Sequence, residues 1–228
     1  VSIAITFTLS EPSINFAVGD ISLSGGTLSN FVGSGTTYTA RFKPSSDGAT
    51  TIDVNSSSFT DLAGNNNSAA SQFNWTYDST SPSITISSST VSSGTSTNTN
   101  SLSLTFTSNK ATTNFDKEDV YITRIDGAIN NGTMTSLSSN SANTVFTTTF
   151  TPPADGVYTF QVGTGKFTDS VGNYNDDVAQ FTWTYDSTNP TMNITSSVSN
   201  NSITNDPSIV LTFTAGQSTS DFTSEDIT

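Results

Sequence analysis

An internal repeat limits the possible folds of this chain more than any other feature of its sequence. The stretch FNWTYDSTSPSITISS, from Phe73 to Ser88, returns as FTWTYDSTNPTMNITSS, from Phe181 to Ser197. The loop FTDLAGN at 59–65 returns as FTDSVGN at 167–173, again 108 residues later. Repetition at this interval predicts tandem copies of one module, each built from roughly 100 residues.

Traces of three copies are present. Ile5-Thr6-Phe7-Thr8 of the first copy matches Leu104-Thr105-Phe106-Thr107 and Leu211-Thr212-Phe213-Thr214. We therefore expect module 1 at residues 1–80, without its first strand, module 2 at 81–188, and the N-terminal part of module 3 at 189–228. The middle copy is longer than the first by about nine residues near Gly127 to Thr144.

Apolar residues alternate with polar ones in short runs, which predicts strands with one buried face. The pattern is clear in Ile3, Ile5, Phe7 and Leu9, and again in Tyr38, Ala40 and Phe42. About seven such runs per copy, separated by turn residues, predict an all-β fold of tandem immunoglobulin-like β-sandwich modules arranged end to end. FNWTY and FTWTY are expected to be the last strands, with Trp75 and Trp183 in the cores. Pro82 and Pro190 should end the linkers that follow them.

Composition excludes several function classes. Cysteine and histidine are both absent, so the chain has no disulfides, no thiolate or imidazole metal site and no Ser–His or Cys–His nucleophile. The net charge of −13 disfavours nucleic acid as a partner. No apolar run approaches the roughly 18 residues of a membrane helix, so we expect no membrane insertion. We also expect no enzymatic activity, because repeated acidic residues do not define a single active site.

The sequence resembles a known family. The succession SEPSINFAVGDISLSGGTLSNFVGSGTTYTARFKP, FTDLAGN and FNWTYDSTSP is similar to the bacterial Ig-like repeats found in tandem in large extracellular adhesins and other surface proteins. The resemblance covers essentially the whole chain. It implies an extracellular stalk or spacer, often stiffened by calcium, without catalysis. Glu11 aligns with Lys110 and Gln217 in the other copies, so no role implied for that acid is general here.

Four aspartates are candidate calcium ligands: Asp61, Asp78, Asp169 and Asp186. Asp61 and Asp169 begin D-x-x-G-N turns, where an Asp side chain commonly accepts backbone N–H groups of its own turn. The alternative is that Asp61 lies near Asp78, and Asp169 near Asp186, where the linker leaves each sandwich. Carboxylates there, together with main-chain carbonyls and water, could bind Ca²⁺ as a cofactor at the junction.

Other acidic residues recur before strands and are expected to close turns. These are Asp20, Asp119 and Asp226. In the middle copy Asp116, Glu118 and Asp119 cluster around Lys117, which makes a weaker second metal candidate.

The sequence thus predicts a spacer segment of an extracellular surface adhesin, whose partners are neighbouring Ig-like modules of the same or adjacent chains. An alternative is a filament subunit that self-assembles head to tail, the C-terminal segment of one molecule adding a strand to the first sandwich of the next. A module that binds glycans through exposed aromatic residues is a third hypothesis. It is weaker, because most aromatic residues alternate onto the buried face of their strands.

Overall fold

The computed structural model describes residues 2–125 and 131–228. The chain is all-β, as predicted, and its residues group into two compact units. Unit 1 contains Val1–Pro82 together with Thr168–Asp176, and unit 2 contains Ser83–Phe167 and Asp177–Thr228. The expected insertion near 127–144 falls partly on residues 126–130, which lie outside the described residues. The predicted boundary of a third module at residue 189 stays a prediction.

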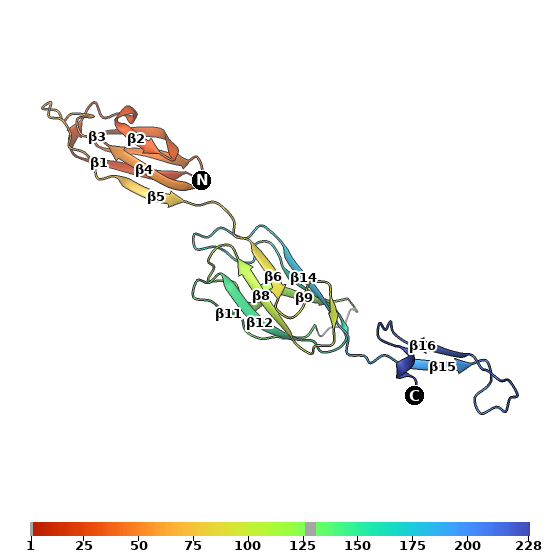
Figure 1. Ribbon diagram of the computed structural model, residues 1–228. Helices are drawn as coiled ribbons and strands as arrows, with labels where there is room; N and C mark the ends of the chain where they lie inside the picture. The colour runs from red at the N-terminus through yellow and green to blue at the C-terminus, as the bar shows by residue number, and fades with distance from the viewer. Residues whose placement is uncertain (1, 126–130) are drawn as a thin grey trace. The chain divides into compact units, whose positions relative to one another are not determined.

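Unit 1 is a sandwich of two antiparallel sheets (Figure 1). One sheet pairs β1 with β3, and the other has the order β2-β4-β5. The bounds are β1 Ile3–Ser13, β2 Ile21–Ser24, β3 Gly26–Pro44, β4 Gly48–Val54 and β5 Phe73–Tyr77.

Unit 2 contains a larger sandwich. One sheet has the order β10-β12-β8-β6, with β11 also on β12, and the facing sheet has the order β7-β14-β13-β9. A separate pair, β15 with β16, follows. The bounds are β6 Ile84–Ser88, β7 Ser96–Thr97, β8 Leu102–Ser108, β9 Val120–Arg124, β10 Thr133–Met134, β11 Ser138–Ser139, β12 Val145–Thr151, β13 Gly156–Val162, β14 Ala179–Tyr185, β15 Met192–Ser196 and β16 Leu211–Ala215.

Three single-turn 3-10 helices lie where Asp20, Asp119 and Asp226 were expected to close turns. They are Val18–Asp20, Lys117–Asp119 and Ser224–Asp226. In each turn the last aspartate accepts the N–H of the residue that precedes the helix. The N···O distances are 2.8 Å for Asp20, 3.1 Å for Asp119 and 2.8 Å for Asp226. The turn interpretation of these three residues is therefore confirmed.

Side-chain burial follows the predicted alternation. In β8, Leu102, Leu104 and Phe106 are buried while Ser103 and Thr107 are exposed. The core of unit 2 lies between its two sheets and contains Phe150, Phe160 and Trp183, all with no exposed surface. Burial of aromatic side chains of this size contributes on the order of 2–3 kcal/mol each.

Unit 1 has its own core around Phe16, Tyr38 and Phe42, but one side of it is less covered. Phe73, which alternation along β5 places on the same face as Trp75, is 58% exposed, whereas its counterpart Phe181 is 2% exposed. Trp75 is half-buried, whereas Trp183 is completely buried. The difference arises because the strands that cover Phe181 and Trp183 in unit 2, β6 and β7, have no counterpart among the described residues of unit 1.

No helix in the described part of the chain is long and apolar enough to span a membrane.

Candidate functional site

The first D-x-x-G-N loop is a self-contained turn around Asp61. One carboxylate oxygen, Oδ1, accepts the N–H groups of Ala63 at 2.9 Å and Asn65 at 2.8 Å. The other oxygen accepts the Asn65 side-chain amide at 2.8 Å. These hydrogen bonds hold the pKa of Asp61 below its usual value, and the bond from the Asn65 side chain has the largest effect. Gly64 follows with φ +89°, a left-handed conformation that suits glycine.

The second loop repeats these bonds around Asp169. Its Oδ1 accepts N–H groups of Val171 at 3.1 Å and Asn173 at 2.9 Å, and its Oδ2 accepts the Asn173 amide at 3.0 Å. Asp169 is buried, with 6% of its surface exposed, whereas Asp61 is half-exposed. The two loops therefore share their internal geometry and differ in what covers them.

The Asp169 loop belongs in sequence to the second copy and in space to unit 1. Asn173 Nδ2 lies 3.2 Å from the main-chain oxygen of Asp78 and 3.3 Å from that of Thr80. With Asp169 Oδ2 at 3.0 Å, three oxygens surround one amide nitrogen that carries only two hydrogens. Two main-chain carbonyls and one carboxylate thus converge on the Asn173 side chain.

The predicted pairing of the four aspartates is wrong. β4 and β5 pair from Gly48↔Tyr77 to Ile52↔Phe73, so Asp61 lies in the loop before β5 and Asp78 follows its other end, roughly 17 Å along the strand. In the second copy, β14 lies along the chain between Asp169 and Asp186 in the same way. The structure instead brings the Asp169 loop to the Asp78–Thr80 segment. Because each last strand runs the length of its sandwich, the loop before it and the linker after it lie at opposite ends.

The side chains of Asp78 and Asp186 close their own turns. Asp78 Oδ1 accepts Thr80 N–H at 3.0 Å, and Asp186 Oδ1 accepts Thr188 N–H at 3.0 Å. The main-chain oxygen of Asp78 faces the Asp169 loop, where it accepts from the side-chain amide of Asn173.

Sequence reasoning missed a pair of acids that bind the linkers. Asp47 Oδ1 accepts the main-chain N–H of Ser79 at 2.9 Å and its hydroxyl at 2.7 Å, and Oδ2 accepts the hydroxyl of Thr80. These hydrogen bonds lower the pKa of Asp47 to about 2. The bonds from the Thr80 and Ser79 side chains have the largest effect.

Asp155 repeats this contact with Ser187 and Thr188, and its pKa is lowered for the same reason. A signal was present in the sequence, because Asp47 and Asp155 have the same spacing of 108 residues as the two DST segments.

The cluster in the middle copy is a capped turn. Asp116 Oδ1 accepts the N–H of Glu118 at 2.9 Å, and Lys117 Nζ lies 3.8 Å from Glu118 Oε1. Burial raises the pKa of Asp119; the hydrogen bond from the Asp116 N–H opposes this shift, and the negative charge of Asp116 adds to it.

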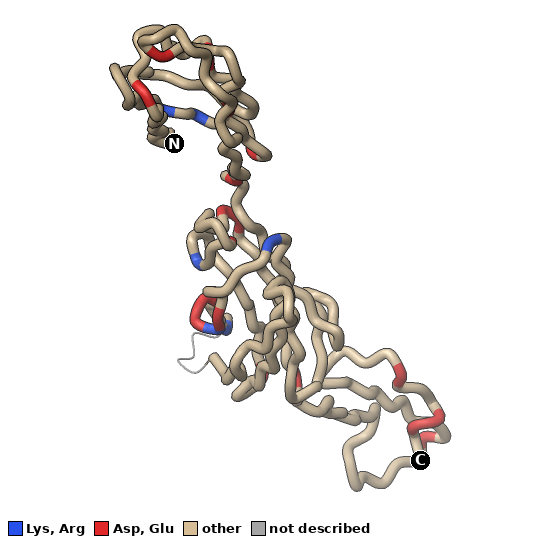
Figure 2. The backbone as a smooth tube through the Cα atoms, turned by 90° about the vertical axis from the view of Figure 1, so that its left-hand side faces the viewer, with Lys and Arg blue, Asp and Glu red and all other residues tan. Residues whose placement is uncertain are grey.

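Acidic residues are spread along both units in Figure 2. Within residues 2–125 and 131–228, no three acidic side chains come together as a potential metal site.

The chain was compared with known proteins. A family model described as a bacterial Ig-like domain matches it twice, at residues 2–77 and at residues 78–184. A search of curated proteins found no match. The two matched segments correspond to the first two sequence copies.

Proposed function

The chain belongs to the bacterial Ig-like domain family, and from this membership we propose that it is a non-catalytic spacer segment of an extracellular surface adhesin. Domains of this family usually occur in surface or extracellular proteins and are typically non-catalytic. In this function the modules hold a binding domain away from the cell, and sheet hydrogen bonds with aromatic cores resist extension.

The observation that carries the proposal is that the repeats have separate cores. The cluster around Phe16, Phe42 and Ile52 contains only residues of the first copy, and the cluster around Phe106, Phe150 and Trp183 contains only residues of the second. A module with its own core can be added to an array, or removed from it, without exposing the core of its neighbour. Such modularity suits a spacer, whose function depends on its length.

Localisation and length test this function. An antibody raised against the purified chain should label intact, unpermeabilised cells of the bacterium that encodes it. Deletion of residues 78–184 from the parent protein should bring its distal part closer to the cell surface while its binding activity is retained. Labelling only after permeabilisation, or loss of binding in a stable deletion variant, would contradict the spacer function.

We further propose that a calcium ion binds where the Asp169 loop meets the linker. Asp169 Oδ2, the main-chain oxygens of Asp78 and Thr80, and Asn173 Oδ1 after a rotation of its amide are the oxygen donors of this site. Carboxylate, carbonyl and amide oxygens are the ligands that Ca²⁺ takes, and water supplies the rest of its six to eight positions. Asn amide oxygen and nitrogen are interchangeable on geometric grounds, so the rotation requires no backbone movement.

The residues of this proposed calcium site differ from those of the predicted one. Asp169 and Asp78 remain in it, Asp78 through its main chain, whereas Asp61 and Asp186 belong to turns elsewhere. The bound ion would fix the Asp169 loop to the linker that precedes its own module and so limit bending there.

A second candidate function, a head-to-tail filament subunit, has support from one observation. Among the described residues, the edge of β1 opposite β3 has no partner strand. An unpaired strand edge offers N–H and C=O groups to another chain. Sedimentation of the purified chain separates the two functions, because a spacer stays monomeric and a filament subunit associates as its concentration rises.

A further inference from the structure

Unit 2 contains a hollow of about 300 Å³ beside the 3-10 turn that precedes β9. One wall is this turn, at residues 116–118. The other wall comes from β11 and the residues that flank it, with Ser139 and Asn143. The buried rings of Phe115 and Phe146 line the hollow from the core side. It therefore has polar walls and an apolar base.

The walls of the hollow are held in place by their own hydrogen bonds. Asp116 Oδ1 accepts the N–H of Glu118 at 2.9 Å, and Asp119 Oδ2 accepts the N–H of Asp116 at 3.1 Å. The N–H of Thr112 donates to the main-chain oxygen of Asn143 at 3.0 Å and so joins one wall to the other. A site with fixed walls loses little conformational entropy when a ligand enters it.

Unit 1 offers a reference for this part of the module, because the two copies can be aligned by a shared contact. A Cβ at Gly26 would lie 2.3 Å from Cζ of Phe42, and a Cβ at Gly132 would lie 2.4 Å from Cζ of Phe150. The two glycines therefore occupy equivalent positions against equivalent rings.

The place of the hollow is filled in unit 1. Phe31 and Tyr38 stack there, with 5.5 Å between ring centroids and 15° between planes, and the Tyr38 hydroxyl donates to the main-chain oxygen of Ser13 at 2.9 Å. Counted from the equivalent glycines and phenylalanines, Leu137 replaces Phe31 and Phe146 replaces Tyr38 in unit 2. Leu137 has no ring and Phe146 has no hydroxyl, which leaves room beside them.

The rim of the hollow is polar, whereas the matching segment of unit 1 is not. Residues 17–19 of unit 1 read Ala-Val-Gly, and residues 116–118 of unit 2 read Asp-Lys-Glu. Ile14 of unit 1 has its counterpart in Thr113. The same place thus loses an aromatic ring in unit 2 and gains hydrogen-bonding side chains.

We propose that this hollow binds one sugar residue of a glycan, a function additional to that of a spacer. Its hydrogen-bonding side chains are those of Asp116, Lys117, Glu118, Ser136, Ser139 and Asn143. Together they offer donors and acceptors over the apolar surface of Leu137 and Phe146. A sugar ring is complementary, because its hydroxyl groups both donate and accept and its C–H face is apolar. The volume is at the lower end of ligand sites, which suits a single ring.

Other classes of ligand fit this lining less well. A phosphate or a nucleotide would meet two carboxylates and one ammonium, and Lys117 Nζ already lies 3.8 Å from Glu118 Oε1. A purely apolar ligand would remove the polar side chains from water without replacing their hydrogen bonds. A neutral ligand with several hydroxyl groups avoids both costs.

The test is a titration of the isotope-labelled 228-residue chain with methyl glycosides of glucose, galactose, mannose, fucose and N-acetylglucosamine, followed by NMR of the backbone amides. At least one glycoside should shift the signals of residues 112–118 and 136–143. The expected Kd is on the order of 1 mM, given a ligand of about a dozen non-hydrogen atoms. The signals of residues 13–19 and 30–38 should stay unchanged, since Phe31 and Tyr38 fill the equivalent place.

Variants locate the binding site. Leu137→Phe gives unit 2 the ring that unit 1 has at Phe31, and it should abolish the response to the glycoside. Glu118→Gln removes an exposed carboxylate acceptor without disturbing the core and should weaken binding roughly tenfold.

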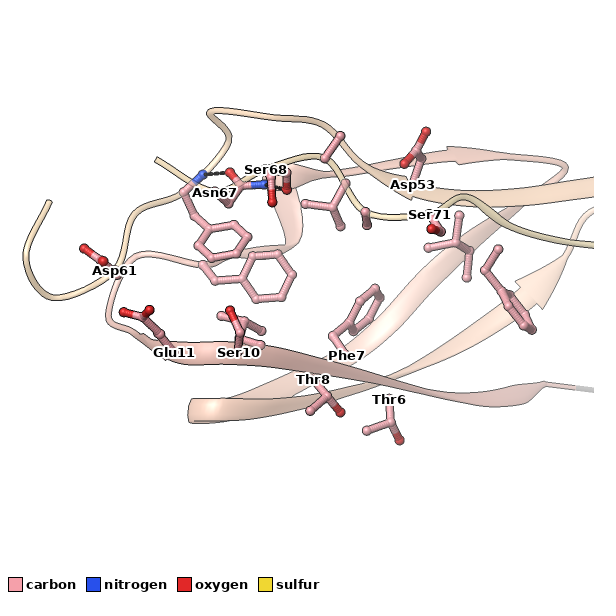
Figure 3. Close-up of a pocket in the computed structure, with 18 of the residues that line it drawn as sticks. Thr6, Phe7, Thr8, Ser10, Glu11, Asp53, Asp61, Asn67, Ser68 and Ser71 are labelled. Carbon is pink, nitrogen blue, oxygen red and sulfur yellow. Dashed lines mark hydrogen bonds between the residues drawn. The ribbon is translucent and has the colours of Figure 1, made fainter. Parts of the chain in front are cut away.

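Glu11→Gln is the matched control for Glu118→Gln. It removes the same charge from a residue that does not line the hollow, on β1 of unit 1, where Figure 3 shows Glu11 beside Asp61. This variant should bind the glycoside as the wild-type chain does.

Several results would overturn the sugar site. They are no shift with any of the glycosides, equal shifts in the equivalent segments of both units, and a response that Leu137→Phe and Glu118→Gln leave unchanged. A response to glycylglycine and to none of the glycosides would assign the hollow to peptides instead. None of these results bears on the spacer function, which is tested by localisation and length.

Discussion

Ser79 donates its hydroxyl hydrogen to Asp47 Oδ1 at 2.7 Å, although the two residues are 32 positions apart. Asp47 lies in the turn between β3 and β4, and Ser79 begins the linker after β5. The same bond joins Ser187 to Asp155 at 2.6 Å. The repeated DST segment is therefore a bound linker, fixed at its start to the turn of its own module.

The Asp47 contact should make stability depend on pH in the acid range. The pKa of Asp47 is lowered from 3.8 to about 2 in the folded protein, so the stabilisation is fully present above about pH 4 and is lost as the pH falls through about 2. Asp47→Asn removes the charge that accepts these bonds. The melting temperature of the wild-type chain should exceed that of the variant at pH 5, and the difference should shrink between pH 4 and pH 2.

Asp53→Asn on β4 is the matched control, because it removes one negative charge from the same unit at a residue outside the turn that binds the linker. A difference between wild type and Asp47→Asn that stays constant from pH 5 to pH 2 would contradict this role of Asp47.

Two glycines of unit 1 should respond differently to the same substitution. A Cβ at Gly26 would lie 2.3 Å from Cζ of Phe42, which is completely buried, whereas a Cβ at Gly19 would meet nothing within 4 Å. We expect Gly26→Ala to cost roughly 1–3 kcal/mol of unfolding free energy through overpacking, and Gly19→Ala to be close to neutral. Urea unfolding measures both, and equal values would show that the contact with Phe42 is not tight.

Calcium should stabilise the chain through Asp169. A ligand that binds only the folded state at a hundredfold excess over its Kd adds about 2.7 kcal/mol. Excess chelator should therefore lower the melting temperature of the wild-type chain. The same treatment should leave Asp169→Asn unchanged, because that variant lacks the charged ligand.

Asp61→Asn is the matched control for calcium, since Asp61 occupies the equivalent turn of the first copy. It should keep the chelator response of the wild-type chain. Identical melting curves of the wild-type chain with and without chelator would end the calcium proposal.

Much of the fold could be predicted because it depends on local patterns. Alternation along Ile3–Leu9 and Leu102–Phe106 defines which face of a strand is buried, and the structure follows it. The two matches to the bacterial Ig-like domain confirm the repeat that FNWTY and FTWTY indicate. The exposure of Phe73 was not predictable from its strand alone, because it depends on whether another strand covers it.

The candidate site was harder to predict because it joins distant residues. Asn173 contacts main-chain oxygens 93 and 95 positions earlier. Because every residue has a main-chain oxygen, the identity of a residue does not indicate such a contact. The sequence-based prediction paired aspartates that are close in sequence, such as Asp61 and Asp78. A β-strand between two residues carries them apart, and the register that shows this is a property of the fold.

The most direct test of the account is whether the two cores unfold separately. Phe160 is completely buried in the core of unit 2, and Phe160→Ala should cost about 3–5 kcal/mol there. Denaturant unfolding would be followed by Trp183 fluorescence in a Trp75→Phe background and by Trp75 fluorescence in a Trp183→Phe background. We predict that Phe160→Ala lowers the midpoint reported by Trp183 and leaves the midpoint reported by Trp75 unchanged; equal shifts of both midpoints would contradict independent modules.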